Sequence, residues 1–501
     1  MPGAIPEPAF CEDAMSRLSG FSLASVIFVF LLLAGSLTGC GGGSSSTAPP
    51  PVGPFSNATF SGTYAIAFSG TNTGGFFSLI GSLQANGSGQ VTGGLVDVNT
   101  ATGVFTSQSV TGTYTVRSNG QALALLTTPA GNFNIDFVMI SAQRALVIRF
   151  DNTATASGSI DRQDSTAFTT ATLQGGLAFN VAGIDASGLA MASAGAFTAN
   201  SAGVITTGVQ DFNDNGTINA NLALSGSYAL GAASGRGSLA LSTTLGTLNF
   251  VFYIVDAGHL KIMETDTVPV LAGDAFRQPA ALTNASLSGP QAFTLGGAQG
   301  NFPFVAGGVF SADGAGNITA GVEDFNSGGS ATRNLPLTGT YAIAASGRGT
   351  LTLNTGTGLT NFVIYPSTGG LQMLETDVTT VSSGAALNQQ AGVFSAASLT
   401  GAFGWNQTGV SAAGEVDQNL QLTLDGTGLL NGSLDVNNAG LLSTGLAAAG
   451  TYTLTANGHG TMVVRSSVGT QSFVIYAVSN SRVLFIDIDA NLIGVGLMEH
   501  Q

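Results

Sequence analysis

The sequence predicts an all-β protein made of four tandem antiparallel meander domains of about 112 residues each. Four sets of landmarks recur in the same order at intervals of 111–115 residues. That interval fits a small domain better than a solenoid repeat of about 20–50 residues. Short apolar or alternating segments are separated by Gly-, Asn- and Ser-rich turn signals about every 8–12 residues, as in a barrel or sandwich.

The landmarks are an opening strand, a strand ending in Asp-x-Asn, a Gly-Thr/Ser-Tyr step and a closing Gly-x-x-x-x-Gln motif. The Asp-x-Asn pairs are Asp97/Asn99, Asp211/Asn213, Asp324/Asn326 and Asp435/Asn437. The closing glutamines are Gln163, Gln278, Gln389 and Gln501. We therefore expect four β repeats over residues 55–168, 169–278, 279–390 and 391–501.

Each repeat carries signals for about eight strands. Eight consecutive antiparallel strands leave two unpaired edges unless the sheet closes, so an eight-stranded barrel is favoured over a two-sheet sandwich, which remains the alternative. The organisation loosely resembles lipocalin-like and avidin-like barrels, although no motif of either family is present. A transmembrane barrel is disfavoured because one Trp and eight Tyr are too few for two aromatic girdles.

Residues 1–39 predict a secretory signal peptide. The apolar run from Leu23 to Leu33 is shorter than the roughly 20 residues that a membrane-spanning helix needs. The following Leu37-Thr38-Gly39-Cys40 resembles the lipobox of bacterial lipoprotein precursors. That resemblance implies cleavage before Cys40 and its lipidation, with palmitate among the acyl chains. The alternative is an ordinary secretory signal with a chance cysteine.

The residues around this segment set the expected start and destination of the protein. Acidic residues precede the apolar core, whereas a signal peptide opens with positive charge, so we expect translation to start at Met15. Residues 40–54 form the lipidated cysteine and a Gly/Ser/Pro tether. Gly41 stands where Asp would signal retention, which by analogy with bacterial sorting signals favours the outer membrane. We expect a lipid-anchored cell-envelope protein that faces the periplasm or the cell surface.

Composition excludes several classes of protein. The net charge is −15 and only 12 residues are Lys or Arg, so no basic surface for nucleic acid or for an anionic membrane is available. Two cysteines and three scattered histidines form no zinc motif. The sequence has no nucleophile elbow, phosphate loop or nucleotide fingerprint. We therefore expect no enzymatic activity and no organic cofactor.

Acidic residues at the ends of strands supply the candidate metal site. In the second repeat, Asp211, Asn213 and Asn215 match the start of a calcium loop, and Glu264 and Asp266 are expected at the same rim. Leu222 stands where such a loop needs its closing Glu, so a solvated rim with Asx turns is the favoured interpretation. A glycosidase-like carboxylate pair is the third possibility.

Two further features are expected to be structural. Arg236 and Arg348 lie in Gly-Arg-Gly turns and are predicted to be exposed. Trp405, the only tryptophan, is predicted to be half-buried at a barrel mouth.

The favoured function is that of a non-enzymatic, lipid-anchored envelope protein whose tandem domains act as a spacer, adhesion or recognition module for a protein or glycan. The alternative is a protein whose barrels hold small apolar ligands. A polysaccharide-acting enzyme ranks third and would need two carboxylates about 5–10 Å apart in a cleft. Filled barrel interiors would favour the first function, and an open apolar interior would favour the second.

Overall fold

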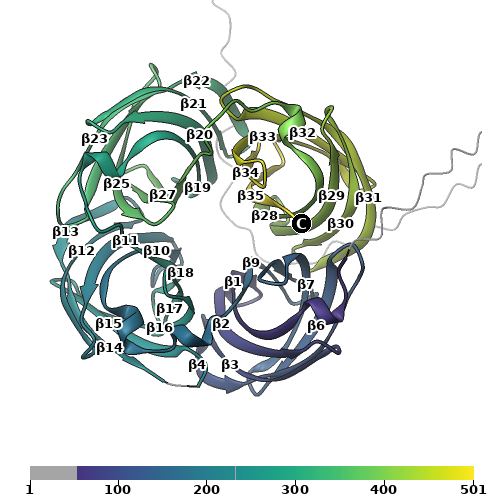
Figure 1. Cartoon of the computed structure of the whole chain (residues 1–501), viewed down its shortest axis with the longest axis horizontal. Coiled ribbons are helices and arrows are strands. Elements are labelled where there is room, and N and C mark those ends of the chain that lie inside the picture. The colour runs from purple at the N-terminus through teal and green to yellow at the C-terminus, as the bar shows by residue number, and fades with distance from the viewer. Residues whose placement is uncertain (1–53, 232) are drawn as a thin grey trace, which may run out of the picture. The chain divides into compact units, whose positions relative to one another are not determined.

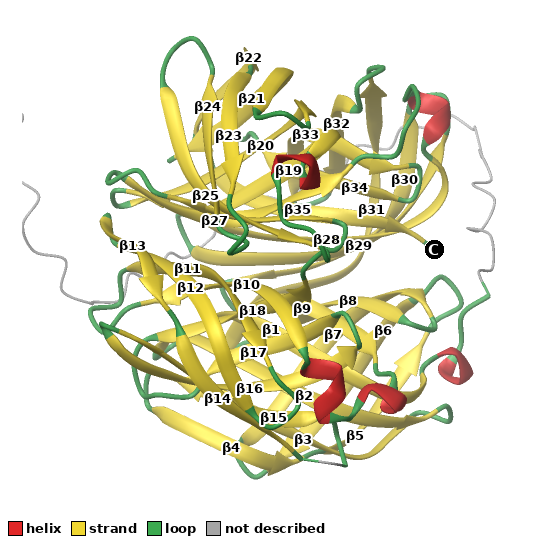
Figure 2. Ribbon diagram, turned by 60° about the vertical axis from the view of Figure 1, so that its left-hand side comes forward, coloured by secondary structure: helices red, strands yellow, loops and turns green. Residues whose placement is uncertain are grey.

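The computed structural model describes residues 54–501 apart from residue 232, and these residues belong to one compact unit (Figure 1). The signal peptide, Cys40 and the tether lie outside the described residues. Within the described part the fold is all-β, with only short 3-10 helices between strands (Figure 2). These helices are η1 (Asn57–Thr59), η2 (Ser165–Ala167), η3 (Thr170–Leu173), η4 (Asn284–Ser286) and η5 (Ala396–Ser398). No helix of the described residues is long and apolar enough to cross a membrane.

The first two repeats each form one closed barrel. Barrel 1 consists of β1 (Ser61–Asn72), β2 (Gly75–Asn86), β3 (Gln90–Thr100), β4 (Gly103–Ser109), β5 (Thr111–Val116), β6 (Gln121–Thr128), β7 (Gly131–Ser141), β8 (Arg144–Arg149) and β9 (Ala154–Arg162). Barrel 2 consists of β10 (Gly175–Ile184), β11 (Ala190–Ala199), β12 (Val204–Asp214), β13 (Thr217–Ala223), β14 (Ser225–Leu230), β15 (Arg236–Thr243), β16 (Gly246–Asp256), β17 (His259–Glu264) and β18 (Val270–Arg277).

The last two repeats form barrels of the same kind. Barrel 3 consists of β19 (Ser288–Gln299), β20 (Phe302–Asp313), β21 (Asn317–Ser327), β22 (Ser330–Pro336), β23 (Thr338–Ile343), β24 (Gly349–Asn354), β25 (Leu359–Ser367), β26 (Gly370–Glu375) and β27 (Thr380–Asn388). Barrel 4 consists of β28 (Thr400–Ser411), β29 (Gly414–Asp425), β30 (Leu429–Asn438), β31 (Leu441–Leu454), β32 (His459–Ser466), β33 (Gly469–Ser479), β34 (Arg482–Asp487) and β35 (Leu492–His500).

Each barrel is an eight-stranded antiparallel meander, as the sequence predicts. In barrel 4 the eight strands close directly, with β28 paired to both β29 and β35. In barrels 1 to 3 the strand that corresponds to β31 is broken at one buried residue, Val110, Leu224 or Leu337, and is therefore counted as two. The expected repeat boundaries near 168/169, 278/279 and 390/391 fall in the connections between barrels, outside every strand.

The glycine of the closing motif marks the seam where the last strand of each barrel meets the first. A Cβ atom added at these positions would clash with a backbone carbonyl oxygen of the first strand. The four distances to that oxygen are 1.9 Å for Gly158, 2.0 Å for Gly273, 2.1 Å for Gly384 and 2.2 Å for Gly496. Only glycine allows the two backbones to approach this closely, which explains why the motif recurs.

The barrel interiors are filled with aromatic and aliphatic side chains. In barrel 1, Phe60 stacks on Tyr64 with ring centroids 4.3 Å apart. The expectation that Trp405 is half-buried at a mouth is wrong, because it is 1% exposed and stacks on Phe485 at 3.7 Å inside barrel 4. A ring of this size gains most by filling the centre of a barrel, where it displaces water from two faces.

The four barrels close into a ring (Figure 1). The first two strands of each barrel pack against the last three strands of the next, and barrel 4 packs on barrel 1 in the same way. Apolar clusters fill the interfaces between barrels 1 and 2, 2 and 3, and 3 and 4, and a smaller cluster lies between barrels 4 and 1. The described repeats thus form a closed ring and not an extended row, because the same heterologous interface recurs until it closes.

Candidate functional site

The Asp-x-Asn motifs lie in the interfaces between barrels. Each aspartate is at most 1% exposed and accepts a hydrogen bond from a side chain at the start of the fifth repeat strand in the next barrel. The donor is an arginine in two interfaces, a histidine in the third and a glutamine in the fourth, and this last pair closes the ring. The pairs are Asp97 with Arg236 (2.6 Å), Asp211 with Arg348 (2.8 Å), Asp324 with His459 (2.9 Å) and Asp435 with Gln121 (2.7 Å).

A buried tyrosine of the next barrel also donates to the same aspartate in three of the interfaces. Tyr253 donates to Asp97 at 2.6 Å, and Tyr365 and Tyr476 take the same place in the following two interfaces. Burial and the neighbouring carboxylate raise the pKa of each of these tyrosines, so they stay protonated donors.

A further donor to each aspartate comes from its own barrel. It is the backbone N–H ten residues later in the chain, at a residue with positive φ in a bulge. These residues are Ser107, Asn221, Asn334 and Gly445. Asn and Gly tolerate the left-handed region best, which accounts for three of the four choices.

The asparagine of each motif completes the cluster by donating to backbone carbonyls at the end of the seventh repeat strand in the next barrel. Examples are Asn99 to the carbonyl oxygens of Glu264 and Asp266, both at 3.0 Å, and Asn437 to that of Arg149 at 2.8 Å. Asn213 and Asn326 bond in the same way. These amide bonds fix the register of adjacent barrels, because each joins a set position of one barrel to a set position of the next.

The closing glutamines perform the corresponding task at the other end of the barrels. Each donates its amide N–H to a backbone carbonyl of the next barrel. The bonds run from Gln163 to Ile254 (2.6 Å), Gln278 to Pro366 (3.4 Å), Gln389 to Ala477 (2.6 Å) and Gln501 to Met139 (2.7 Å). The last of these again joins barrel 4 to barrel 1.

The prediction that Arg236 and Arg348 are exposed turn residues is wrong. Their side chains are 23% and 17% exposed and form ion pairs with aspartates that are fully buried. Each arginine does lie far from the aspartate of its own repeat, but its partner belongs to the preceding barrel. One feature of the sequence does indicate that these positions have a structural role. Asp-x-Asn and the closing Gln recur in all four copies, which differ at most other positions.

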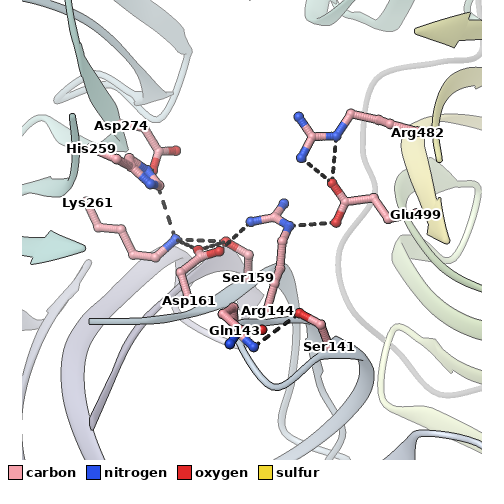
Figure 3. A network of polar contacts seen from close by, with 10 residues as sticks. All are labelled: Ser141, Gln143, Arg144, Ser159, Asp161, His259, Lys261, Asp274, Arg482 and Glu499. Carbon is pink, nitrogen blue, oxygen red and sulfur yellow. Dashed lines mark hydrogen bonds and ion pairs between the residues drawn. The ribbon is translucent and has the colours of Figure 1, made fainter. Parts of the chain in front are cut away.

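A second charged network joins barrels 2, 1 and 4 near the middle of the ring (Figure 3). Lys261, the only lysine, is 1% exposed and lies 2.8 Å from Asp161. Arg144 bridges Asp161 at 2.5 Å and Glu499 at 2.6 Å. Burial opposes ionisation of Asp161, but Lys261 and Arg144 outweigh it and lower its pKa. These residues occupy no common motif, so sequence reasoning did not find them.

The residues of the candidate calcium site are directed to different neighbours. The Asp211 carboxylate binds Arg348 of barrel 3, and Asn213 donates to barrel 3 carbonyls. Glu264 contacts Asn99 of barrel 1, Asp266 binds Asn249, and Asn215 lies in an exposed turn. Within the described part of the chain no group of three or more His, Cys, Asp and Glu residues could hold a metal ion.

The calcium site therefore stays a prediction from sequence alone. Its test is the melting temperature of the full chain with calcium and with a chelator. A calcium-dependent increase that Asp266→Asn removes would support it, because an ion bound only to the folded state stabilises that state.

Buried acids end the seventh repeat strand in barrels 2, 3 and 4. Glu264, Glu375 and Asp487 are opposite core phenylalanines in the strand register and are at most 4% exposed. Burial raises the pKa of Glu264 to about 9 and the pKa values of Glu375 and Asp487 to about 8. Barrel 1 has Arg149 at this position, paired with Asp151 at 2.8 Å.

Comparison with known proteins adds little. No family model and no curated protein matches the chain. Among solved structures, a mutant of Transferrin Binding Protein B from Haemophilus parasuis is 9% identical over 71% of this chain and 83% of that one, with a TM-score of 0.18. The intact Ap-TbpB, with N and C lobes, is 8% identical over 87% and 76%, with a TM-score of 0.14. These likenesses carry no argument about function.

The aspartate–arginine pairs make a specific prediction about stability. Arg348→Ala should lower the stability of the full chain by about 3 kcal/mol, because it leaves the Asp211 carboxylate buried without its cationic partner. Thermal melting and urea denaturation measure this loss. Arg333→Ala, at an exposed position of the same barrel, is the matched control and should change stability little. Equal effects of the two variants would contradict the assigned role of the pair.

The buried acids predict that stability falls as the pH rises. Because their pKa values are higher in the folded state than in the unfolded state, their protonated forms favour folding below pH 4 and this contribution is lost towards pH 8–9. The melting temperature should therefore decrease between pH 5 and pH 9. Glu375→Gln should reduce that decrease, whereas Asp256→Asn, at the exposed end of β16, should not. A pH profile that Glu375→Gln leaves unchanged would refute this assignment.

Proposed function

We propose that the protein is a non-enzymatic recognition module of the bacterial cell envelope, a ring of four barrels held at the outer membrane by lipidated Cys40. Two structural features support a module of this kind. The recurring acidic and amide residues, which could have been catalytic, are bonded across the barrel interfaces. The barrel cores are filled with side chains.

The observation that carries the recognition role is the turn face, defined as the turns that follow the first, third, fifth and seventh repeat strands. Each Asp-x-Asn asparagine, near this end of one barrel, bonds to carbonyls at the same end of the next, so the turns of all four barrels share one side of the ring. Exposed apolar side chains gather in or beside these turns, namely Leu245, Val268, Phe302, Leu359, Val378, Leu441 and Val468.

Such side chains on a rigid scaffold favour a macromolecular partner. Phe302 and Leu359 are each 62% exposed, and Leu441 is 73% exposed. Apolar groups displayed by short turns bind best when the scaffold is already ordered, because little conformational entropy is lost on association. A protein surface or the apolar face of a glycan would bury them.

Photo-crosslinking in the bacterium that expresses the protein tests the recognition role. A photoreactive phenylalanine analogue at Phe302 or Leu359 should give discrete adducts with an envelope component. The same analogue at Leu429, which is 58% exposed but follows an even-numbered repeat strand, is the matched control and should give none. Equal labelling at all three positions, or no adduct at the turn face, would contradict the proposal.

Anchoring is tested separately at Cys40. Cys40→Ser should release the protein from the membrane fraction or leave its signal peptide uncleaved, because the thioether needs the cysteine sulfur. Fractionation and mass spectrometry of the mature N-terminus measure both outcomes. Normal processing together with membrane retention of the variant would refute lipidation at Cys40.

A further inference from the structure

The mouth of barrel 2 on the turn face differs from the other three. The loop between β10 and β11 has five residues (185–189), whereas the equivalent connections of the other barrels have two (73–74, 300–301 and 412–413). The loop between β17 and β18 also has five residues (265–269), where the other barrels have four. The two longer loops are neighbours on the rim, because β10 pairs with β18.

A cavity of about 300 Å³ lies in this mouth. Its apolar lining includes Phe212 and Leu248 on the walls and Leu245 and Val268 at the rim. The two rim side chains are 58% and 49% exposed, an unfavourable state for aliphatic groups that a bound apolar body would relieve. The volume matches the lower end of small-molecule sites.

Two hydrogen-bond acceptors in the cavity have no partner in the protein. Gln210 is 1% exposed, and its amide nitrogen donates to the Ser193 hydroxyl at 2.9 Å, which leaves its side-chain oxygen without a donor. One carboxylate oxygen of Asp214 is likewise buried and unpartnered. Both residues line the cavity, and a buried acceptor without a donor destabilises the unliganded protein.

Unpartnered acceptors at both positions are found together in barrel 2. The position of Gln210 is occupied by Val96 in barrel 1, by the buried acid Glu323 in barrel 3 and by Leu434 in barrel 4. The position of Asp214 is occupied by Thr100, Ser327 and Asn438, of which Asn438 also has an unpartnered side-chain oxygen. Asp185, on the long loop, also lines the cavity. Burial and the Asp185 carboxylate raise the pKa of Asp214, which places two acids close together.

We propose that this cavity binds a small organic cation, an ammonium group attached to an apolar body. The ammonium would donate N–H to the Asp214 carboxylate, and its charge would offset the repulsion between Asp214 and Asp185. The Gln210 oxygen lies farther along the same strand, about 13 Å away by strand rise, and would accept from a second donor group where the ligand carries one. The apolar body would lie against Phe212, Leu248 and Val268. No Lys, Arg or His lines the cavity, so no cationic side chain there competes for these acceptors or attracts an anion.

Calorimetric titration of the purified full-length protein with 2-phenylethylammonium, 2-phenylethanol and 3-phenylpropanoate tests the proposal. The three probes share an apolar body and differ in charge. We expect one ammonium per chain, bound at least about tenfold more tightly than the alcohol because its hydrogen bonds are charge-assisted, and no binding of the carboxylate. Equal affinity for ammonium and alcohol, or no binding at millimolar concentrations, would overturn it.

Variants locate the binding. Asp214→Asn should weaken ammonium binding at least about tenfold and leave the alcohol unaffected. Asp185→Asn, on the loop, should weaken it in the same direction and serves if Asp214→Asn does not fold. Asn438→Ala, at the equivalent position of barrel 4, is the matched control and should have no effect. Ammonium binding that survives both aspartate substitutions would place the ligand elsewhere and refute the site. Because the assay needs neither the membrane nor a macromolecular partner, its result is independent of the recognition role.

Discussion

The ring depends on a carboxylate buried between each pair of neighbouring barrels. A charged aspartate loses its hydration when two barrels meet, and it is stable there only if donors replace the water. Its own barrel offers one donor, the backbone N–H ten residues later, and the next barrel must offer the rest. Adjacent barrels can therefore pack in only one register, the one that brings an arginine, histidine or glutamine to the carboxylate. This requirement explains why the aspartate persists in every repeat while its partner varies.

The interface between barrels 4 and 1 is the most polar of the four. The others bury apolar clusters that include a tyrosine, whereas this interface has Val138 in place of the tyrosine and Gln121 in place of a cation. Additional polar contacts compensate, among them Asn419 with Asp136 at 2.8 Å and Ser157 with Asn406 at 2.6 Å. These bonds join segments about 250–280 residues apart in the chain, so ring closure carries the largest loop-closure entropy of any contact in the fold.

Five of the 12 Lys and Arg residues belong to ion-pair networks at the places where barrels meet. Arg144, Lys261 and Arg482 link carboxylates of three barrels near the middle of the ring, and Arg236 and Arg348 hold the interface aspartates. A buried cation surrounded by carboxylates is specific in direction and distance in a way that an apolar contact is not. The net charge of −15 itself follows from 27 acidic residues against 12 Lys and Arg.

The sequence by itself determined the repeat, the strand count and the closure of each barrel. Strand periodicity, turn residues and the seam glycines such as Gly158 act between neighbours in the chain or within one repeat, so a single copy contains the information. The lipobox is equally local. The acidic residues at the strand ends can also be recognised within a single repeat. Their roles cannot, because the pattern of a strand does not specify which barrel packs against its outward face.

Only the tertiary structure decided the roles of the polar residues. Arg348 and Asp211 belong to different repeats and lie 137 positions apart, and nothing in either repeat specifies that the two meet. The cavity of barrel 2 likewise depends on two loops that are each one to three residues longer than in the other copies, and on Gln210 at a position that is apolar in barrels 1 and 4. Barrel formation follows from local pattern because strand pairing is sequential, whereas the ring and its cavity follow from contacts between surfaces that the chain brings together only after each barrel has closed.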